Sequence, residues 1–302
     1  MNPPDERRLE GTALPARLAD LDTPPAALFA RGEFPRGPLV ALVGTRYPSE
    51  QAVAYTESLS RELVQAGVSV ISGGAEGIDT AAHRGTLAAN GVTVVMAPAG
   101  FEHPFPEENR ELFENVVACG GAYLSLVEHH TPATRGIFFQ RNACLVALAH
   151  VVVVIEAPVR SGARNAAAKA RRLGRPLFVV PYPPWHGKGQ GCVAELKLGA
   201  RPLAGVRDVL KVLDQQRLHP LSVDAAVESS QSGQQSLGFP ETLQPHSARE
   251  ALLETVRRGA SLSDEIVAQT GLPVAQVAQL ILTLRLEGVL VADPAGRIEF
   301  SK

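Results

Sequence analysis

Runs of apolar residues recur along the first two thirds of the chain, and segments with helical spacing of apolar residues separate them. The apolar runs lie at 39–43, 68–71, 92–96, 122–124, 151–155 and 177–180, and the helical patterns at 50–66, 79–90, 107–118, 139–148 and 163–173. Strands that are apolar throughout are typical of a parallel sheet covered by helices on both faces. The pattern therefore predicts a doubly wound α/β fold with a mostly parallel sheet.

The pattern divides the chain into four parts. Residues 1–38 hold short apolar pieces interrupted by prolines, and we expect a lead-in segment packed on the next domain. Residues 39–215 form the α/β domain, and residues 216–247, rich in Ser, Gln and Pro, have the composition of a flexible linker. Three helical patterns and a hairpin pattern follow at 248–302, which predicts a small C-terminal winged-helix domain.

The predicted winged helix is weakly suited to nucleic acid. Such domains often bind duplex DNA through their third helix. Here the third pattern, 274–287, offers Gln276, Gln279 and Arg285 as outward polar side chains, and acidic residues slightly outnumber basic ones from residue 248 onward. We expect a protein-docking module and keep duplex DNA binding as the alternative.

A glycine-rich segment follows the apolar run at 68–71, and a helical pattern begins directly after it. In α/β folds ligands bind beyond the carboxyl ends of strands, and glycine lets backbone N–H groups and a helix N-terminus approach a phosphate. The segment matches neither GxxxxGK[ST] nor GxGxxG, so a turn needed only for packing stays the alternative. The residues expected to meet an anion are Ser72, Gly73, Gly77, Ile78 and Asp79.

The charges are unevenly distributed, although the formal net charge is only -2. Acidic residues dominate between 47 and 134, with eleven against three Lys and Arg, whereas residues 135–201 hold eleven basic and two acidic residues. A surface that follows a nucleic-acid backbone needs such a basic region, because binding depends on Lys and Arg neutralising phosphates. The alternative is an ordinary solvated helix face.

The composition excludes several classes of protein. With 302 residues and 45% hydrophobic residues the chain can form a globular core. The three cysteines have no metal-binding spacing and are odd in number, so we expect no disulfide framework, no metal site and a reducing, cytoplasmic compartment. No signal peptide or apolar run of membrane-spanning length is present, so we expect a soluble protein with no membrane association.

Two loop residues are further candidates for contacts with nucleic acid. Arg46 follows the apolar run at 39–43, where its guanidinium can form a bidentate contact with a phosphate; the alternative is a salt bridge with Glu50. Trp185 lies in a loop between Pro184 and His186 and is either an extra stacking surface or a plug at the edge of the core.

A cation and an aromatic ring also lie together before the helical pattern at 139–148. Arg135 and Phe138 are three residues apart, at what we expect to be a loop edge. Stacking of bases on aromatic rings, with cations on the backbone, is how single strands are held without sequence preference. Arg141 and Asn142 at the opening of the helix suit a phosphate and a hydrogen bond, although Asn142 equally suits bracing its own loop.

Taken in order, several short motifs resemble the DNA-processing protein A (DprA/Smf) family across about residues 39–205. They include Val43 to Arg46, Ser72 to Asp79 with Ala82 and His83, and Phe105 to Asn109, and no single motif is decisive because the specificity lies in their order. Further matches are Phe138 to Asn142, Val154 to Ala157 with Ser161 and Gly162, Gly174 with Arg175, and Gly199 with Ala200.

The resemblance implies a Rossmann-like domain that binds single-stranded DNA and forms a homodimer. It implies that the protein passes the strand to the RecA recombinase in recombination and natural transformation. It also implies a protein that is not an enzyme, with no catalytic residue and no cofactor. By the same resemblance Arg46 is a DNA-contacting arginine, and Ser161 and Gly162 form a second anion-contacting turn.

The chain departs from the family pattern at several positions. Glu76 replaces the arginine of the family's SGxARGID segment, and the family's RNRxI motif loses its second arginine after Asn142. In the second turn a hydroxyl is lost and Arg164 is gained. We therefore expect a divergent member in which Arg164, with Lys169 one turn later, compensates for the lost arginine.

Two enzyme classes are the alternatives. A phosphoribohydrolase of the "lonely guy" type shares the glycine-rich phosphate loop, but its PGGxGTxxE segment has no counterpart at 159–165. A serine hydrolase would need GxSxG, which is absent. His83 has the right chemistry for a general base, yet no partner carboxylate can be assigned from spacing, so a structural histidine is the preferred interpretation.

Overall fold

The computed structural model describes residues 6–218, 245–259, 263–270, 272, 277, 280, 281, 283, 284, 289–292 and 298–300. The chain forms two compact units, Met1–Ala225 and Ala226–Lys302, and each is described by itself.

The first unit is built on a nine-stranded sheet in the order β1-β2-β6-β5-β4-β3-β7-β8-β9. From β6 to β9 every neighbouring pair is parallel, while β1 and β2 join the β6 edge antiparallel. The strands are β1 (Arg7–Glu10), β2 (Ala27–Gly32), β3 (Leu39–Val43), β4 (Ser69–Ser72), β5 (Thr93–Ala97), β6 (Ala122–Ser125), β7 (Val151–Val154), β8 (Leu177–Val179) and β9 (Arg201–Pro202). The predicted α/β fold with a mostly parallel sheet is confirmed.

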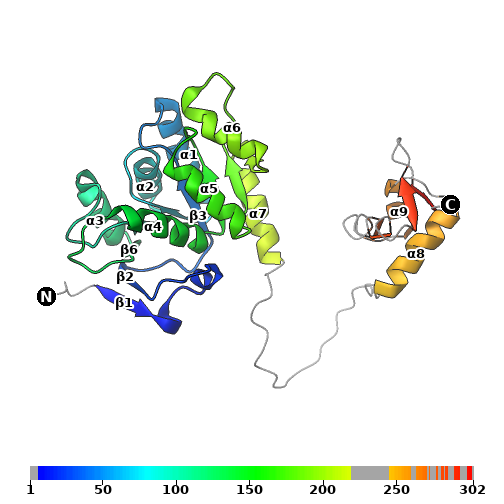
Figure 1. Cartoon of the computed structure of the whole chain (residues 1–302), viewed down its shortest axis with the longest axis horizontal. Coiled ribbons are helices and arrows are strands. Elements are labelled where there is room, and N and C mark those ends of the chain that lie inside the picture. Colours follow the sequence, from blue (N-terminus) through cyan, green and yellow to red (C-terminus); the bar gives the residue numbers. More distant parts are fainter. Residues whose placement is uncertain are drawn as a thin grey trace. The chain divides into compact units, whose positions relative to one another are not determined.

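Helices cover both faces of this sheet. They are α1 (Glu50–Gln65), α2 (Ile78–Ala88), α3 (Arg110–Ala118), α4 (Arg135–Leu148), α5 (Gly162–Arg172), α6 (Gln190–Lys197) and α7 (Val206–Leu218). Short 3-10 helices lie at Gly11–Ala13, Ala16–Asp20, Glu107–Asn109 and Gly187–Gly189. Figure 1 shows α4 and α5 side by side across one face.

The core follows from the alternation of side chains along the strands. In β3, Leu39, Ala41 and Val43 pack on one face together with apolar residues of α4 and α5, and Val40 and Leu42 pack on the other with α1 and α7. Both sets are almost completely buried. Each large apolar side chain removed from water contributes about 1.5–3 kcal/mol, so β3 is anchored from both sides.

Two helices near the cavity described below begin at serine caps. The Ser49 side chain accepts a hydrogen bond from the Ala52 N–H at the start of α1, and Ser161 accepts one from the Arg164 N–H at the start of α5. Such caps satisfy N–H groups that have no partner within the helix. In α5 a stripe of small residues at 163, 166, 167 and 170 is buried, which brings the helix close to the sheet.

The order of the strands changes direction at β3. The chain moves from β3 through β4 and β5 to β6 on one side, and then returns to place β7, β8 and β9 on the other side. The connections that leave the carboxyl ends of β3 and β7 therefore run to opposite faces of the sheet and leave a crevice between them.

Two parts of the first unit differ from the sequence analysis. The segment 1–38 supplies β1 and β2 to the sheet, with Leu28 and Ala30 buried. Helix α4 begins at Arg135, four residues before the predicted helical pattern. Arg135 and Phe138 therefore lie in the first turn of a helix, and the prediction that they lie at the edge of a loop is wrong.

The second unit contains α8 (Pro245–Arg257), α9 (Ser263–Thr270) and the antiparallel strands β10 (Leu290–Ala292) and β11 (Ile298–Phe300). Leu252, Ile266, Leu284 and Leu290 belong to its apolar core. Most of the third helical pattern, 274–287, and the predicted hairpin turn at 294–296 lie outside the described residues. The linker prediction also falls largely outside them, at 219–244, so the winged helix and the linker stay predictions.

Candidate functional site

A cavity of about 360 Å³ lies at the crevice between β3 and β7. Its walls come from the loop after β3, the first half of α4, and the turn that leads into α5. The cavity brings together seven of the residues that the sequence singles out, although they are spread over more than a hundred positions: Arg46, Asp79, Phe138, Arg141, Asn142, Ser161 and Gly162.

The ring of Phe138 lies close to two guanidinium groups. The Cζ atom of Arg46 is 5.6 Å and that of Arg141 is 5.8 Å from the centre of the ring. Phe105 meets the same ring edge-on at 5.4 Å between centroids, and Arg46 also lies 5.9 Å from the Phe105 ring. Arg46 is exposed, so the cavity has a cation at its mouth and an aromatic ring behind it.

Arg141 is a buried cation held by backbone carbonyls. Its Nη1 atom donates to the Met96 carbonyl at 2.8 Å and to the carbonyl of Gly73. A side chain at Gly73 would collide with this guanidinium, which explains the glycine there. Burial lowers the pKa of Arg141, and the positive charge of Arg46 lowers it further, while the carboxylate of Asp79 opposes both. Arg141 thus supports the cavity floor through Nη1, while its buried Nε has no hydrogen-bond partner among the described residues.

Asp79 is the counter-charge to Arg141. Its carboxylate accepts a hydrogen bond from the Ala75 N–H at 3.3 Å. Burial raises the pKa of Asp79, and Arg141 and the backbone hydrogen bonds work against that rise. Asp79 is the acidic residue among those that line the cavity, whereas Arg46, Arg141 and Arg160 also line it, so positive charge prevails there.

The glycine-rich segment uses several of its polar groups internally. The Ile78 N–H donates to the Thr45 carbonyl, and the Thr80 N–H donates to the Ala75 carbonyl. Ser72 is fully buried, and its hydroxyl donates to the Leu42 carbonyl at 2.6 Å. Gly77 has a φ of 79° and packs against the Thr45 carbonyl, where a side chain would collide. The Ile78 N–H is therefore already bonded within the protein, and Ser72 and Gly77 take part in packing, while the anion contact of the segment stays a prediction.

The start of α5 faces the cavity. Ser161 caps this helix, and Gly162 and Ala163 follow it on the cavity wall. No atom lies within 4 Å of the position that a side chain at Gly162 would take, so the backbone is accessible there. The first turn of α5 holds no acidic residue. Its N-terminus thus offers partial positive charge, and Asn142 is tied to it by a hydrogen bond from Nδ2 to the Gly162 carbonyl at 3.4 Å.

Arg135 is the first residue of α4 and is exposed, but it does not line the cavity. A cation at a helix N-terminus opposes the helix dipole, which costs about 0.3–1 kcal/mol. The first turn of α4 holds no acidic residue to offset it. Helix stability therefore gives no reason for an arginine at this position.

The expectation for Arg164 has to be revised. Its Nε donates to Oε1 of Glu195 at 2.7 Å, and its Nη1 donates to the Val159 carbonyl at 2.8 Å. Glu195 is 1% exposed and also binds Arg171. A buried carboxylate needs such partners. Arg164 is therefore used in holding α5 against α6 instead of replacing the lost arginine at the cavity.

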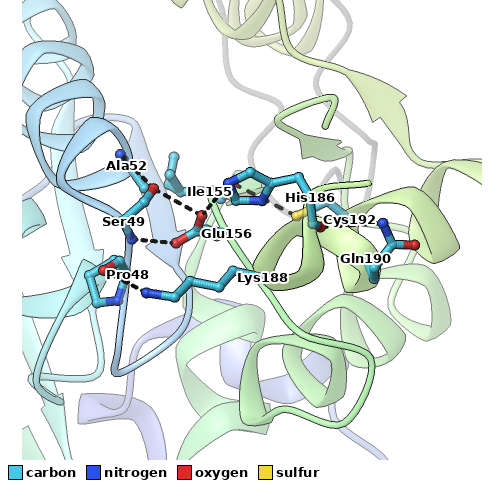
Figure 2. A network of polar contacts seen from close by, with 9 residues as sticks. All are labelled: Pro48, Ser49, Ala52, Ile155, Glu156, His186, Lys188, Gln190 and Cys192. Carbon is cyan, nitrogen blue, oxygen red and sulfur yellow. Dashed lines mark hydrogen bonds and ion pairs between the residues drawn. The ribbon is translucent and has the colours of Figure 1, made fainter. Parts of the chain in front are cut away.

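A second polar network, which the sequence analysis missed, braces the loop after β3. Glu156 follows β7, is fully buried, and accepts hydrogen bonds from the Ser49 N–H at 2.7 Å and the Ser49 hydroxyl at 3.0 Å. Figure 2 shows His186 on the other side of this carboxylate, with its Nε2 at 3.7 Å from Oε1. The Thr45 N–H also donates to the Glu156 carbonyl at 2.7 Å. Glu156 thus fixes the loop that carries Arg46.

Two cavity residues escaped the sequence analysis. Arg160 and Tyr47 line the cavity and are exposed. Phe105, which begins one of the family motifs, packs on Phe138. Tyr47 and Arg160 adjoin residues or motifs already singled out, so their position next to Arg46 and Ser161 was the available signal.

His83 and a possible cation-binding group lie apart from this cavity. His83 is buried, its Nδ1 lies 2.8 Å from the Thr93 hydroxyl, and burial lowers its pKa to about 3, which suits a structural histidine. Among the described residues, Glu102, His129 and His130 form the one group whose ligand atoms, all within 4.8 Å of one another, suit a metal ion. None of these residues lines the cavity.

No described helix has both the length and the apolar character of a membrane span.

Comparison with known proteins agrees with the fold and the motifs. Residues 8–214 match the family model of DNA recombination-mediator protein A. Protein Smf of Synechocystis is 31% identical over 94% of this chain and 77% of its own length. The crystal structure of DNA processing protein A from Streptococcus pneumoniae superposes with a TM-score of 0.62 at 28% identity, covering 68% of this chain and 73% of that one. A DNA processing protein A structure from Helicobacter pylori, described by its single-stranded DNA binding mode, gives a TM-score of 0.61 at 28% identity, with 70% and 96% coverage.

Proposed function

Because this chain belongs to the DNA recombination-mediator protein A family, we propose that it binds single-stranded DNA in the cavity between β3 and β7. The substrate class is a flexible polyanion with accessible base faces. The similarity to the Helicobacter pylori protein, described as binding single-stranded DNA, supports this choice.

The observation that carries the proposal is the position of Phe138 beside Arg46. A single strand presents phosphates and unstacked bases together, and proteins bind it by combining cations with aromatic rings. The exposed Arg46 provides the cation, and Phe138, 5.6 Å away, provides the ring. A duplex keeps its base faces stacked inside, so the Phe138 ring gives no advantage with double-stranded DNA.

Further phosphate contacts come from Arg160 and the start of α5 at the cavity, and from Arg135 outside it. Arg135 and Arg160 are exposed cations, and Ser161 and Gly162 present the N-terminus of α5. Helix N-termini bind phosphate through free N–H groups and the helix dipole. Asn142 orients this turn and offers an additional hydrogen bond.

The buried residues of the predicted set hold the site in shape. Arg141 and Asp79 form the charged floor, and Ser72, Gly73, Gly77 and Ile78 fix the loop above it. We propose that these residues act by positioning Arg46 and Phe138.

The role in recombination follows from the family description. We propose that the bound strand is transferred to the RecA recombinase, that the chain acts as a homodimer in the cytoplasm, and that natural transformation is one setting. The family's recombination-mediator description supports the transfer, and the homodimer, the cytoplasm and natural transformation rest on the resemblance alone.

An enzymatic function has less support. Among the described residues that line the cavity, the acidic one is Asp79, and it already pairs with the Ala75 N–H and Arg141. A phosphoribohydrolase would need a carboxylate free to act on the sugar. The protein is accordingly proposed to bind DNA without catalysis.

The test is a binding assay with single-stranded and duplex oligonucleotides, run beside a nucleotide-hydrolysis assay. We expect tight binding of oligo-dT, weaker binding of the duplex, and no release of base from nucleoside monophosphates. Nucleotide turnover without strand binding would reject the proposal and support the phosphoribohydrolase.

A further inference from the structure

Two aromatic side chains of the first unit are unusually exposed. Trp185 is 85% and Tyr47 is 75% exposed, the highest values for large apolar side chains among the described residues. Tyr47 lies next to Arg46 and lines the cavity. An exposed aromatic ring beside such a site can stack on a base of a bound strand.

The loops that carry these two residues contact each other. Lys188, three residues after Trp185, donates from Nζ to the carbonyl of Pro48 at 3.3 Å. His186 lies against Glu156, which binds Ser49 (Figure 2). The loop at 181–189 is therefore joined to the loop after β3 directly beyond Tyr47.

Trp185 is exposed on a well-braced loop. The Gln190 side chain donates to the carbonyls of Pro184 and His186, which flank Trp185. The ring of Tyr182 packs on that of His186, with 4.6 Å between the centroids, and Gly189 leaves room for it. A braced loop loses little conformational entropy when a ligand stacks on it, so the exposed ring is prepared for binding.

The charge of this surface fits a polyanion. Arg46 and Arg160 are exposed at the cavity, and the Lys188 ammonium lies where the two loops meet. The nearby acid Glu156 is fully buried, and Glu50 is exposed at the start of α1. Cations beside aromatic rings form the usual surface for a single strand.

We propose that Tyr47 and Trp185 form a second stacking surface, which continues the path of the single strand out of the cavity. The ligand is a flexible single-stranded nucleic acid, and the inference rests on the proposed function of the cavity. The cavity holds the nucleotides next to Phe138, and Tyr47 and Trp185 hold bases further along the strand.

The first test uses the fluorescence of Trp185, because it is the single tryptophan of the chain. Stacking of a base on this ring quenches its emission. Titration with unlabelled oligo-dT is expected to quench the emission with the same midpoint as the anisotropy change of a labelled strand.

The second test compares Trp185→Ala and Trp185→Phe on strands of two lengths. With oligo-dT of about sixteen nucleotides, Trp185→Ala is expected to bind roughly five- to ten-fold more weakly, and Trp185→Phe close to wild type. With about four nucleotides, enough for the cavity alone, Trp185→Ala is expected to bind like the wild type. Leu198→Ala, which removes another exposed apolar side chain at 53% exposure, is the control and should bind both strands normally.

The outcomes separate this inference from the proposed function. Tight binding without quenching, and with Trp185→Ala unchanged on the long strand, would overturn the second surface and leave the cavity proposal intact. If both Phe138→Ala and Arg46→Ala bound the strand as tightly as the wild type, the cavity proposal itself would be overturned. A change of molecular mass in Trp185→Ala by light scattering, with affinity unchanged, would assign Trp185 to a contact between copies and reject the inference.

Discussion

The guanidinium carbon of Arg46 lies 5.6 Å from the centre of the Phe138 ring, although 92 positions separate the two residues in the chain. The contact joins the loop after β3 to the first turn of α4 across the crevice of the sheet. It places a cation for a phosphate next to a ring for a base, and the predictions below depend on this pairing.

Substitution of Phe138 and Arg46 is expected to weaken binding of a single strand in different ways. Phe138→Ala loses base stacking worth about 1–3 kcal/mol, which is roughly a 5- to 150-fold rise in Kd. Arg46→Ala loses a phosphate contact, which should reduce the slope of log K against log salt by about 0.7. Anisotropy titrations across salt concentrations measure both effects. Arg207→Ala removes an exposed cation on α7 and is the control. If it weakened strand binding as much as Arg46→Ala, the effect of Arg46 would reflect the overall positive charge of the protein and not a specific phosphate contact.

Arg164 and Arg135 form a matched pair for separating stability from binding. Arg164→Ala leaves the buried Glu195 with one partner fewer, and we expect the free energy of unfolding to fall by about 1.5–3 kcal/mol with nearly unchanged affinity for oligo-dT. Arg135→Ala is expected to weaken binding and to raise stability slightly, by up to about 1 kcal/mol, because it removes a cation from a helix N-terminus. Urea denaturation and strand titration measure the two quantities. Weaker strand binding with unchanged stability in Arg164→Ala would instead show that Arg164 contacts DNA.

His83 is expected to make folding sensitive to acid. Its pKa is about 3 in the folded protein and about 6.5 when unfolded, so the unfolded state binds more protons between these values and stability falls as the pH drops. The loss from this one group between pH 7 and pH 5 is about 2 kcal/mol. The raised pKa of Asp79 acts in the opposite direction, so the comparison must be made with a variant. His83→Gln should lack this part of the pH dependence, and an unchanged dependence in urea denaturation would contradict the assignment.

Glu156 is expected to be a positioning residue for two loops. Glu156→Ala removes the acceptor for both donors of Ser49, and we expect the free energy of unfolding to fall by about 2–4 kcal/mol. The loop at 181–189 should also become more mobile, which lowers the fluorescence anisotropy of Trp185. Glu156→Gln keeps an acceptor oxygen, so its free energy of unfolding and its Trp185 anisotropy are expected to lie between those of the wild type and those of Glu156→Ala. Normal stability together with normal anisotropy in Glu156→Ala would show that the network is dispensable.

The parallel part of the sheet could be predicted because its strands are apolar on both faces. The antiparallel strands β1 and β2 could not, since β1 is a four-residue edge strand and both strands lie in a segment interrupted by prolines. The start of α4 was missed because Gly136, a poor helix former, is its second residue and no acidic residue marks its first turn. Weak local signals of this kind are overridden by packing.

Residues of the candidate site could be predicted from the sequence only where the local pattern alone places them at a strand end or a helix start. Arg46, Phe138 and Ser161 lie near strand ends or helix starts, and the topology brings those together. That Arg141 packs beneath Gly73, 68 positions away, depends on the folded chain. The same holds for the pairing of Arg164 with Glu195, 31 positions away, which no spacing rule indicates.

Photochemical cross-linking tests the central claim most directly. An oligo-dT strand containing 5-bromodeoxyuridine is irradiated with the full-length protein, and the cross-linked peptides are identified by mass spectrometry. We predict that the principal cross-linked peptide contains Phe138 and that the cross-link is lost in Arg46→Ala at moderate salt. Cross-links confined to the second unit, at 245–300, with none in α4 or in the loop after β3, would contradict the account.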